Sequence, residues 1–143
     1  MRLAVLDTNV IVSAAIGSVG PPAKIFANLV LGGTVHAVTS PSIAAEYREV
    51  SRRAKFHRYG FPPLWLEYLI EESMRLPDIG LWPYVCPDPK DTPFIALAHA
   101  AGAWLVTGNL EHFPEAMRNG ARVVSPADYL AHLRSHSPET SQI

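Results

Sequence analysis

Short apolar runs alternate with helix-like segments along almost the whole chain. Five of these runs are too short for helices and are typical of buried strands: residues 3–6, 34–39, 81–85, 104–107 and 122–124. Helical patterns lie between them, at residues 8–16, 21–33, from Ser40-Pro41 onward, 62–76, 92–102 and 127–134. The alternation predicts an α/β fold with a mainly parallel central sheet and helices on both faces, which is a three-layer α/β/α arrangement.

The length suits one domain, which we place at residues 1–135, followed by a polar tail at residues 136–143. Hydrophobic residues make up 48% of the 143 residues, enough to bury a core, which excludes a chain that is disordered throughout. There are 12 Lys and Arg against 13 Asp and Glu, so binding of nucleic acid through bulk positive charge is excluded, although a local basic patch is not.

The single cysteine, Cys86, cannot form an internal disulfide and leaves no cysteine-based zinc site. The N-terminal apolar run is broken by Asp7, so it resembles neither a signal peptide nor a membrane span. We therefore expect a cytoplasmic protein with no membrane partner.

Two aspartates are expected at the edge of the sheet where parallel strands end. Asp7 directly follows the first strand-like run, and Asp91 precedes the helix at 92–102, which is apolar on nearly every side and is therefore buried. Helix capping is the alternative role for both, and for Asp7 the two roles are equally good. Asp88, between two prolines, fits a capping role better than Asp91 does.

Two further residues point to the same edge. At 100° per residue, Glu46 borders the buried stripe of its helix, whereas Glu49 faces water and can pair with Arg53. Asn109 follows the fourth strand-like run as Asp7 follows the first. The alternatives are a boundary side chain for Glu46 and ordinary turn chemistry for Asn109.

Three carboxylates packed together repel one another and need a cation to remain ionised. Oxygen ligands without cysteine favour Mg²⁺ or Mn²⁺. Such a site would stabilise charge on a phosphate and activate water for attack on a phosphodiester.

Four sequence blocks together resemble the PIN domain family, and most closely its bacterial toxin-like (VapC-like) members that pair with antitoxins. The blocks are LDTNV with Asp7 and Asn9, AAEYREV with Glu46, DPKDTPFIALA with Asp91, and LVTGNLEHFP with Thr107, Asn109 and Glu111. They occur in the family's order over residues 2–126.

The resemblance implies a three-layer α/β/α fold and a ribonuclease that depends on Mg²⁺ or Mn²⁺. It implies that Asp7, Glu46 and Asp91 bind the metal and that Asn9 and Thr107 support the site. It also implies a small cognate antitoxin as partner and a homodimer. Asn109 is a departure, because the family often has an aspartate there. Glu111 is the candidate to supply the missing carboxylate.

The densest basic cluster follows Glu46 and comprises Arg48, Arg52, Arg53, Lys55 and Arg58. It can flank the predicted site and neutralise RNA phosphates. A solvated helix end is an equally good interpretation.

Two other functions remain open. The first is a non-catalytic binding module, for which the replacement by Asn109 would mark lost activity. The second is an aspartyl phosphotransferase or phosphatase that uses Asp7 as nucleophile, although such enzymes usually have a second acid where this chain has Asn9.

Overall fold

The computed structural model describes residues 2–17, 19–84 and 86–135, and within them a five-stranded parallel sheet. The strands are β1 (Arg2–Leu6), β2 (Val35–Thr39), β3 (Met74–Arg75), β4 (Trp104–Val106) and β5 (Val123–Val124), in the order β3-β2-β1-β4-β5. The predicted α/β class with a parallel sheet is confirmed. The predicted tail, residues 136–143, lies outside the described residues.

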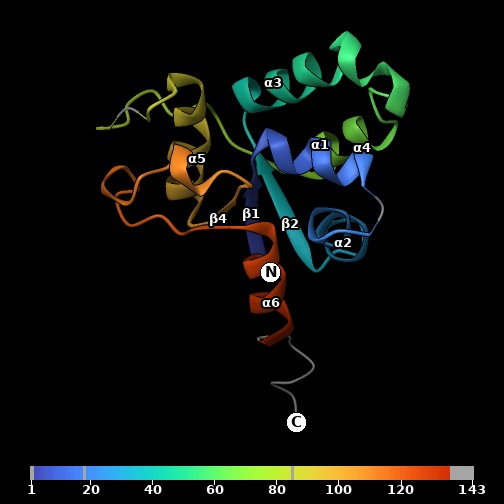
Figure 1. Ribbon diagram of the computed structural model, residues 1–143. Helices are drawn as coiled ribbons and strands as arrows, with labels where there is room; N and C mark the ends of the chain where they lie inside the picture. Colours follow the sequence, from blue (N-terminus) through green and yellow to red (C-terminus); the bar gives the residue numbers. More distant parts are fainter. Residues whose placement is uncertain (1, 18, 85, 136–143) are drawn as a thin grey trace.

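The helices connect these strands. They are α1 (Thr8–Ile16), α2 (Pro21–Lys24) with its π-helical continuation η1 (Ile25–Val30), α3 (Pro41–Ser51), α4 (Trp65–Glu72), α5 (Thr92–Ala101) and α6 (Pro126–Ser135). Short 3₁₀ turns lie at η2 (Ala54–Tyr59), η3 (Pro89–Asp91), η4 (Leu110–His112) and η5 (Glu115–Met117). In Figure 1, α1, α2 and α4 group on the right and α5 lies on the left.

The strand order explains this distribution of helices. From β1 to β3 the chain moves in one direction across the sheet, and after β3 it returns past β1 to β4. Because parallel crossovers are right-handed, this reversal puts α5 on the opposite face from the helices between β1 and β3. The reversal point lies between β1 and β4, where folds of this kind place their ligands.

Helix α5 forms the centre of the core. Phe94, Ile95 and Leu97 are buried, and the helix packs against β1, β2 and β4. It ends at Gly102, which has a φ of 63°. That left-handed conformation suits a residue without a Cβ, so the sequence-based end of this helix is confirmed.

The helix predicted at residues 62–76 is too long. Helix α4 covers only Trp65–Glu72, and the chain then becomes extended at Ser73 and forms β3. The Ser73 hydroxyl donates to Ile70 O and contacts the Thr39 hydroxyl, and Leu76 N donates to Thr39 O. These contacts hold the segment beside β2 rather than in another helical turn.

The strand predicted at residues 81–85 is also wrong over the described residues 81–84, which are not in a strand. The Leu81 side chain is 91% exposed, so this apolar run does not reach the core. Val85 lies outside the described residues. The third strand is instead β3, an exposed two-residue segment whose position depends on the long-range contacts to Thr39.

No single helix in the described ranges is long and apolar enough to cross a membrane. Helix α1 and Pro21–Ala27, bent by 93°, meet the length and composition criterion only as a pair, as buried core helices also do.

Candidate functional site

Asp7 and Thr107 lie next to each other at the carboxyl edge of the sheet. Each directly follows a strand, β1 and β4 respectively, and the two strands are paired. Asp7 N donates to Val106 O at 2.9 Å, which extends the ladder to the edge. Both side chains are buried. The strand reversal therefore places a buried carboxylate where ligands bind in open α/β sheets.

Asp7 acts as a helix cap and is also the centre of a hydrogen-bond network. Its Oδ1 accepts from Thr8 N at 2.8 Å. Its Oδ2 accepts from Thr107 Oγ1 at 2.7 Å and from Asn9 Nδ2 at 3.4 Å. The two roles weighed for Asp7 are therefore compatible, because a carboxylate has about four acceptor positions.

The turn after β4 is tied to the same network. Asn109 N donates to Thr107 Oγ1 at 3.0 Å, and Gly108 N donates to Asn9 Oδ1 at 3.0 Å. Asn9 and Thr107 thus hold the Asp7 carboxylate on one side and the turn on the other. Asn109 is partly buried beside them.

Glu46 approaches this network from α3. It is partly buried, and the Thr8 hydroxyl donates a hydrogen bond to its Oε2. Glu49 faces away and pairs with Arg53 at 2.9 Å, as the helical angles predict. The buried Tyr47 donates from its hydroxyl to Leu6 O and so anchors α3 to the end of β1. Thr8 therefore connects Glu46 to Asp7.

Asp91 does not cap the helix that follows it. Its side chain makes no cap hydrogen bond, whereas Asp88 accepts from Lys90 N at 3.0 Å and caps the preceding turn. The Oδ2 of Asp91 is buried and lacks a hydrogen-bond partner. His112 Nδ1 lies 3.2 Å from it without hydrogen-bond geometry. Asp91 is thus a partly buried carboxylate whose Oδ2 accepts no hydrogen bond from the described residues and lies within ion-pair distance of His112.

The three carboxyl groups share an unusual electrostatic state. Burial raises the pKa of Asp7, although hydrogen bonds from Thr107 and Thr8 oppose the shift. Burial also raises the pKa of Glu46, and the negative charge of Asp7 adds to the rise. Burial and then repulsion by Asp7 raise the pKa of Asp91 to about 6. A bound cation would reverse all three shifts.

The donor chemistry of these residues fits a hard divalent cation. All are carboxylate oxygens, and the orphaned Oδ2 of Asp91 is a ready ligand. In the conformation seen here, however, no three His, Cys, Asp or Glu side chains of the described residues are arranged closely enough to hold a metal ion. The charge of Asp7 acts on both Glu46 and Asp91, but the three carboxylates do not surround a common point.

The comparisons with known proteins agree with the fold. A family model described as a PIN domain matches residues 3–111, which is most of the chain. The chain belongs to the PIN domain family. A crystal structure of VapBC2 from Rickettsia felis, bound to a DNA fragment from their promoter, includes a chain with the same fold. The TM-score is 0.58 at 18% identity, over 87% of this chain and 98% of that chain. None of the curated proteins searched matches this chain.

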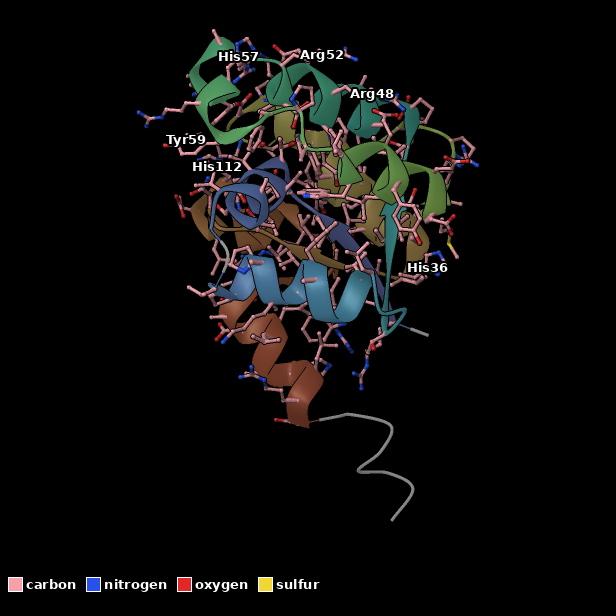
Figure 2. All side chains as sticks on the ribbon, turned by 90° about the vertical axis from the view of Figure 1, so that its right-hand side faces the viewer. His36, Arg48, Arg52, His57, Tyr59 and His112 are labelled. Atoms are coloured by element: carbon pink, nitrogen blue, oxygen red, sulfur yellow. The ribbon has the colours of Figure 1, made fainter. Side chains whose placement is uncertain are left out.

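The other predicted site residues of this PIN domain are placed less centrally. Glu111 is exposed and has no hydrogen bond or ion pair to the acids within the described part, so the structure does not bring it into the site. In the basic cluster, Arg48 forms two hydrogen bonds to Glu67, and Arg53 forms two to Glu49. In Figure 2 the labelled Arg48, Arg52 and His57 lie along the upper edge, apart from His112.

Three residues near the acids were missed by sequence reasoning. Thr8 holds Glu46, His112 faces Asp91, and Lys90 lowers the pKa of Glu46 through its charge. Thr8 and Lys90 are direct neighbours of Asp7 and Asp91, and His112 lies one turn after Asn109. Adjacency to predicted site residues was the available signal, but it does not say which neighbour turns inward.

Proposed function

We propose that this PIN domain is a Mg²⁺- or Mn²⁺-dependent endoribonuclease, with Asp7, Glu46 and Asp91 as the metal-binding acids. The observation that carries the proposal is the electrostatic coupling of three carboxyl groups with raised pKa values, in which Asp7 raises the pKa of both Glu46 and Asp91. Such an arrangement destabilises the metal-free protein. It is expected where the acids serve a cation rather than the fold.

Each acid has a distinct task in the proposed mechanism. Thr107 and Asn9 fix the Asp7 carboxylate, and the Thr8 hydroxyl fixes Glu46. Asp91 contributes its Oδ2, which accepts no hydrogen bond from the described residues. When bound, the divalent ion stabilises negative charge on the phosphodiester and activates water. Asn109 contributes no charge, so three carboxylates carry the whole metal-binding task.

Cleavage of labelled RNA by the purified protein tests this function. We expect Mn²⁺-dependent cleavage that EDTA abolishes and that Asp7→Asn or Asp91→Asn removes. Asp88→Asn is the matched control, because Asp88 is exposed and Asn can also cap its turn. Intact RNA in excess metal, with the protein folded and unpartnered, would favour the non-catalytic alternative. A phosphoenzyme on Asp7 would favour the phosphotransferase.

We further propose that the protein is the toxin of a toxin-antitoxin pair, that it forms a homodimer and that it acts in the cytoplasm. The shared fold with a chain of the VapBC2 structure and the four PIN-like sequence blocks support this proposal. Induced expression in bacteria should arrest growth, and the Asp7→Asn variant should not. Sedimentation of the purified protein measures its oligomeric state.

A further inference from the structure

The negative charge of the site repels the phosphates of an RNA strand that approaches it. Asp7, Glu46 and Asp91 present three carboxylates to a polyanion, so the backbone of the RNA needs cations at the rim of the site. The basic cluster on α3 and η2 is the obvious candidate from the sequence. Its position and its partners both argue against that role.

Most side chains of the basic cluster already interact with other side chains, and η2 lies far from the acids. Arg48 and Arg53 are ion-paired with Glu67 and Glu49. Arg58 donates to the Tyr59 hydroxyl, and the Lys55 ammonium lies over the Phe56 ring. Figure 1 places η2, in green, at the far end of α3 from the carboxyl end of β1. Glu46, in the middle of α3, is linked to the acids through its hydrogen bond from the Thr8 hydroxyl.

Two other basic residues, Lys90 and His112, lie beside the acids. His112 lies 3.2 Å from Asp91 Oδ2 and also acts electrostatically on Asp7. Lys90 precedes Asp91 in η3 and acts electrostatically on Glu46. The Lys90 side chain is exposed and has no ion pair to any described residue, and the His112 side chain is 44% exposed. Both side chains can therefore contact a ligand in solvent, and His112 does so while facing Asp91.

The two residues come from different turns. Lys90 lies in η3, which leads into α5, and His112 lies in η4, which follows β4 and is held by a hydrogen bond from His112 N to Asn109 O. We propose that Lys90 and His112 bind the phosphodiester backbone of the RNA beside the acid cluster. This inference rests on the proposed ribonuclease function and assigns its substrate contacts.

The orientation of the His112 ring allows two substitutions to distinguish phosphate binding from positioning of Asp91. Its Nδ1 faces Asp91, so contact with a phosphate falls to Nε2. A glutamine amide can reach the position of Nε2, whereas an asparagine amide reaches only the position of Nδ1. A phosphate-binding role therefore predicts that His112→Gln retains RNA affinity and His112→Asn loses it. A role confined to positioning Asp91 predicts the reverse.

The test is the binding of labelled single-stranded RNA to the full chain in EDTA, followed by fluorescence anisotropy over a series of salt concentrations. Lys90→Gln should weaken binding several-fold and reduce the slope of log affinity against log salt by about 0.7, the value for one lost phosphate contact on a single strand. Lys90→Arg should restore both. Lys24→Gln, which removes the same charge from exposed α2, is the matched control and should change neither.

Three outcomes would overturn the proposal. The first is unchanged affinity and slope for Lys90→Gln, in particular if Arg52→Gln weakens binding instead. The second is the reversed order of the two His112 variants. The third is a wild-type protein that does not bind RNA in EDTA: if the same preparation cleaves labelled RNA in Mn²⁺, only the substrate contacts are overturned, and if it does not, the ribonuclease function is overturned as well. Retained RNA cleavage by Lys90→Gln with unchanged affinity would overturn only the substrate contacts.

Discussion

The Asp91 carboxylate is held at a cost to stability when no metal is bound. Its pKa is about 6 in the folded protein and near 3.8 in the unfolded chain, mainly because it is buried and close to Asp7. The folded state therefore binds its proton more tightly. The stabilisation that the folded state gains from binding this proton is fully present below about pH 4 and is lost as the pH rises through 6.

Asp91→Asn should therefore stabilise the metal-free protein. We expect the free energy of unfolding to rise by about 1–2 kcal/mol at pH 8, a value reduced for the partial exposure of the group, and to change little near pH 4. Urea unfolding in EDTA at the two pH values measures this difference. Asp88→Asn should show no such pH dependence. Equal free energies of unfolding for Asp91→Asn and the wild type at pH 8 would contradict the conclusion that the ionised Asp91 carboxylate destabilises the metal-free protein.

Asn109 offers a complementary change. It lies beside Thr107 with a neutral side chain, so Asn109→Asp would add a fourth negative charge near the three acids. We expect Mn²⁺ affinity to rise about tenfold, which corresponds to ~1.4 kcal/mol of added attraction, and the metal-free protein to become less stable. Isothermal titration calorimetry measures the affinity. Glu111→Gln is the control, and a large loss of affinity in that variant would show that Glu111 does reach the metal.

At the residue scale, the sequence indicated which acids lie near the carboxyl edge of the sheet, but it did not indicate their hydrogen-bond partners. Asp7, Glu46 and Asp91 could be located from strand ends and helical angles. The Thr8–Glu46 hydrogen bond and the contact of His112 with Asp91 could not, because they depend on side-chain orientation in turns. Glu111 illustrates the same limit, since it was favoured for its charge whereas its neighbour His112 faces the site.

At the scale of elements, the helix ends show what local sequence can specify. The end of α5 at Gly102 requires a positive φ. Gly102→Ala should lower the free energy of unfolding by about 1 kcal/mol, because a Cβ is strained in the left-handed region. Gly17→Ala is the matched control, since Gly17 ends α1 with a φ of −97° and tolerates a side chain. Denaturant midpoints of the two variants should separate clearly, and equal midpoints would contradict this interpretation.

Elements set by distant contacts were predicted poorly. The sequence predicts the start of α3 at Ser40-Pro41 correctly, but the Ser40 side chain makes no cap hydrogen bond. Asp78 instead accepts from Ser42 N at 3.1 Å and from Ser42 Oγ at 2.7 Å, and these bonds lower the pKa of Asp78. Strand β3 likewise depends on Thr39. Neither partner is close in sequence.

At the scale of the whole molecule, metal binding should stabilise the protein. A ligand at about 100 times its dissociation constant adds ~2.7 kcal/mol to the free energy of unfolding. Mn²⁺ should therefore raise the melting temperature, EDTA should reverse the rise, and Asp7→Asn should abolish it. Differential scanning fluorimetry measures the shift, and a rise of equal size in Asp7→Asn would place the ion elsewhere.

The same binding should depend on pH. Metal ligands must be deprotonated, and the carboxyl pKa values here are raised, to about 6 for Asp91. We therefore expect Mn²⁺ affinity to fall as the pH drops through 6, and Asn109→Asp to move this transition to higher pH. Titrations in buffers from pH 5 to 8 measure it, a range chosen around the Asp91 value. A pH-independent affinity would contradict the assignment of Asp91 as a ligand.

The hydrogen bond from Thr107 to Asp7 joins residues 100 positions apart. During synthesis, the first acid leaves the ribosome long before the hydroxyl that orients it, and the two can meet only after β4 has paired with β1. A nascent or truncated chain that ends before residue 107 therefore lacks an assembled site.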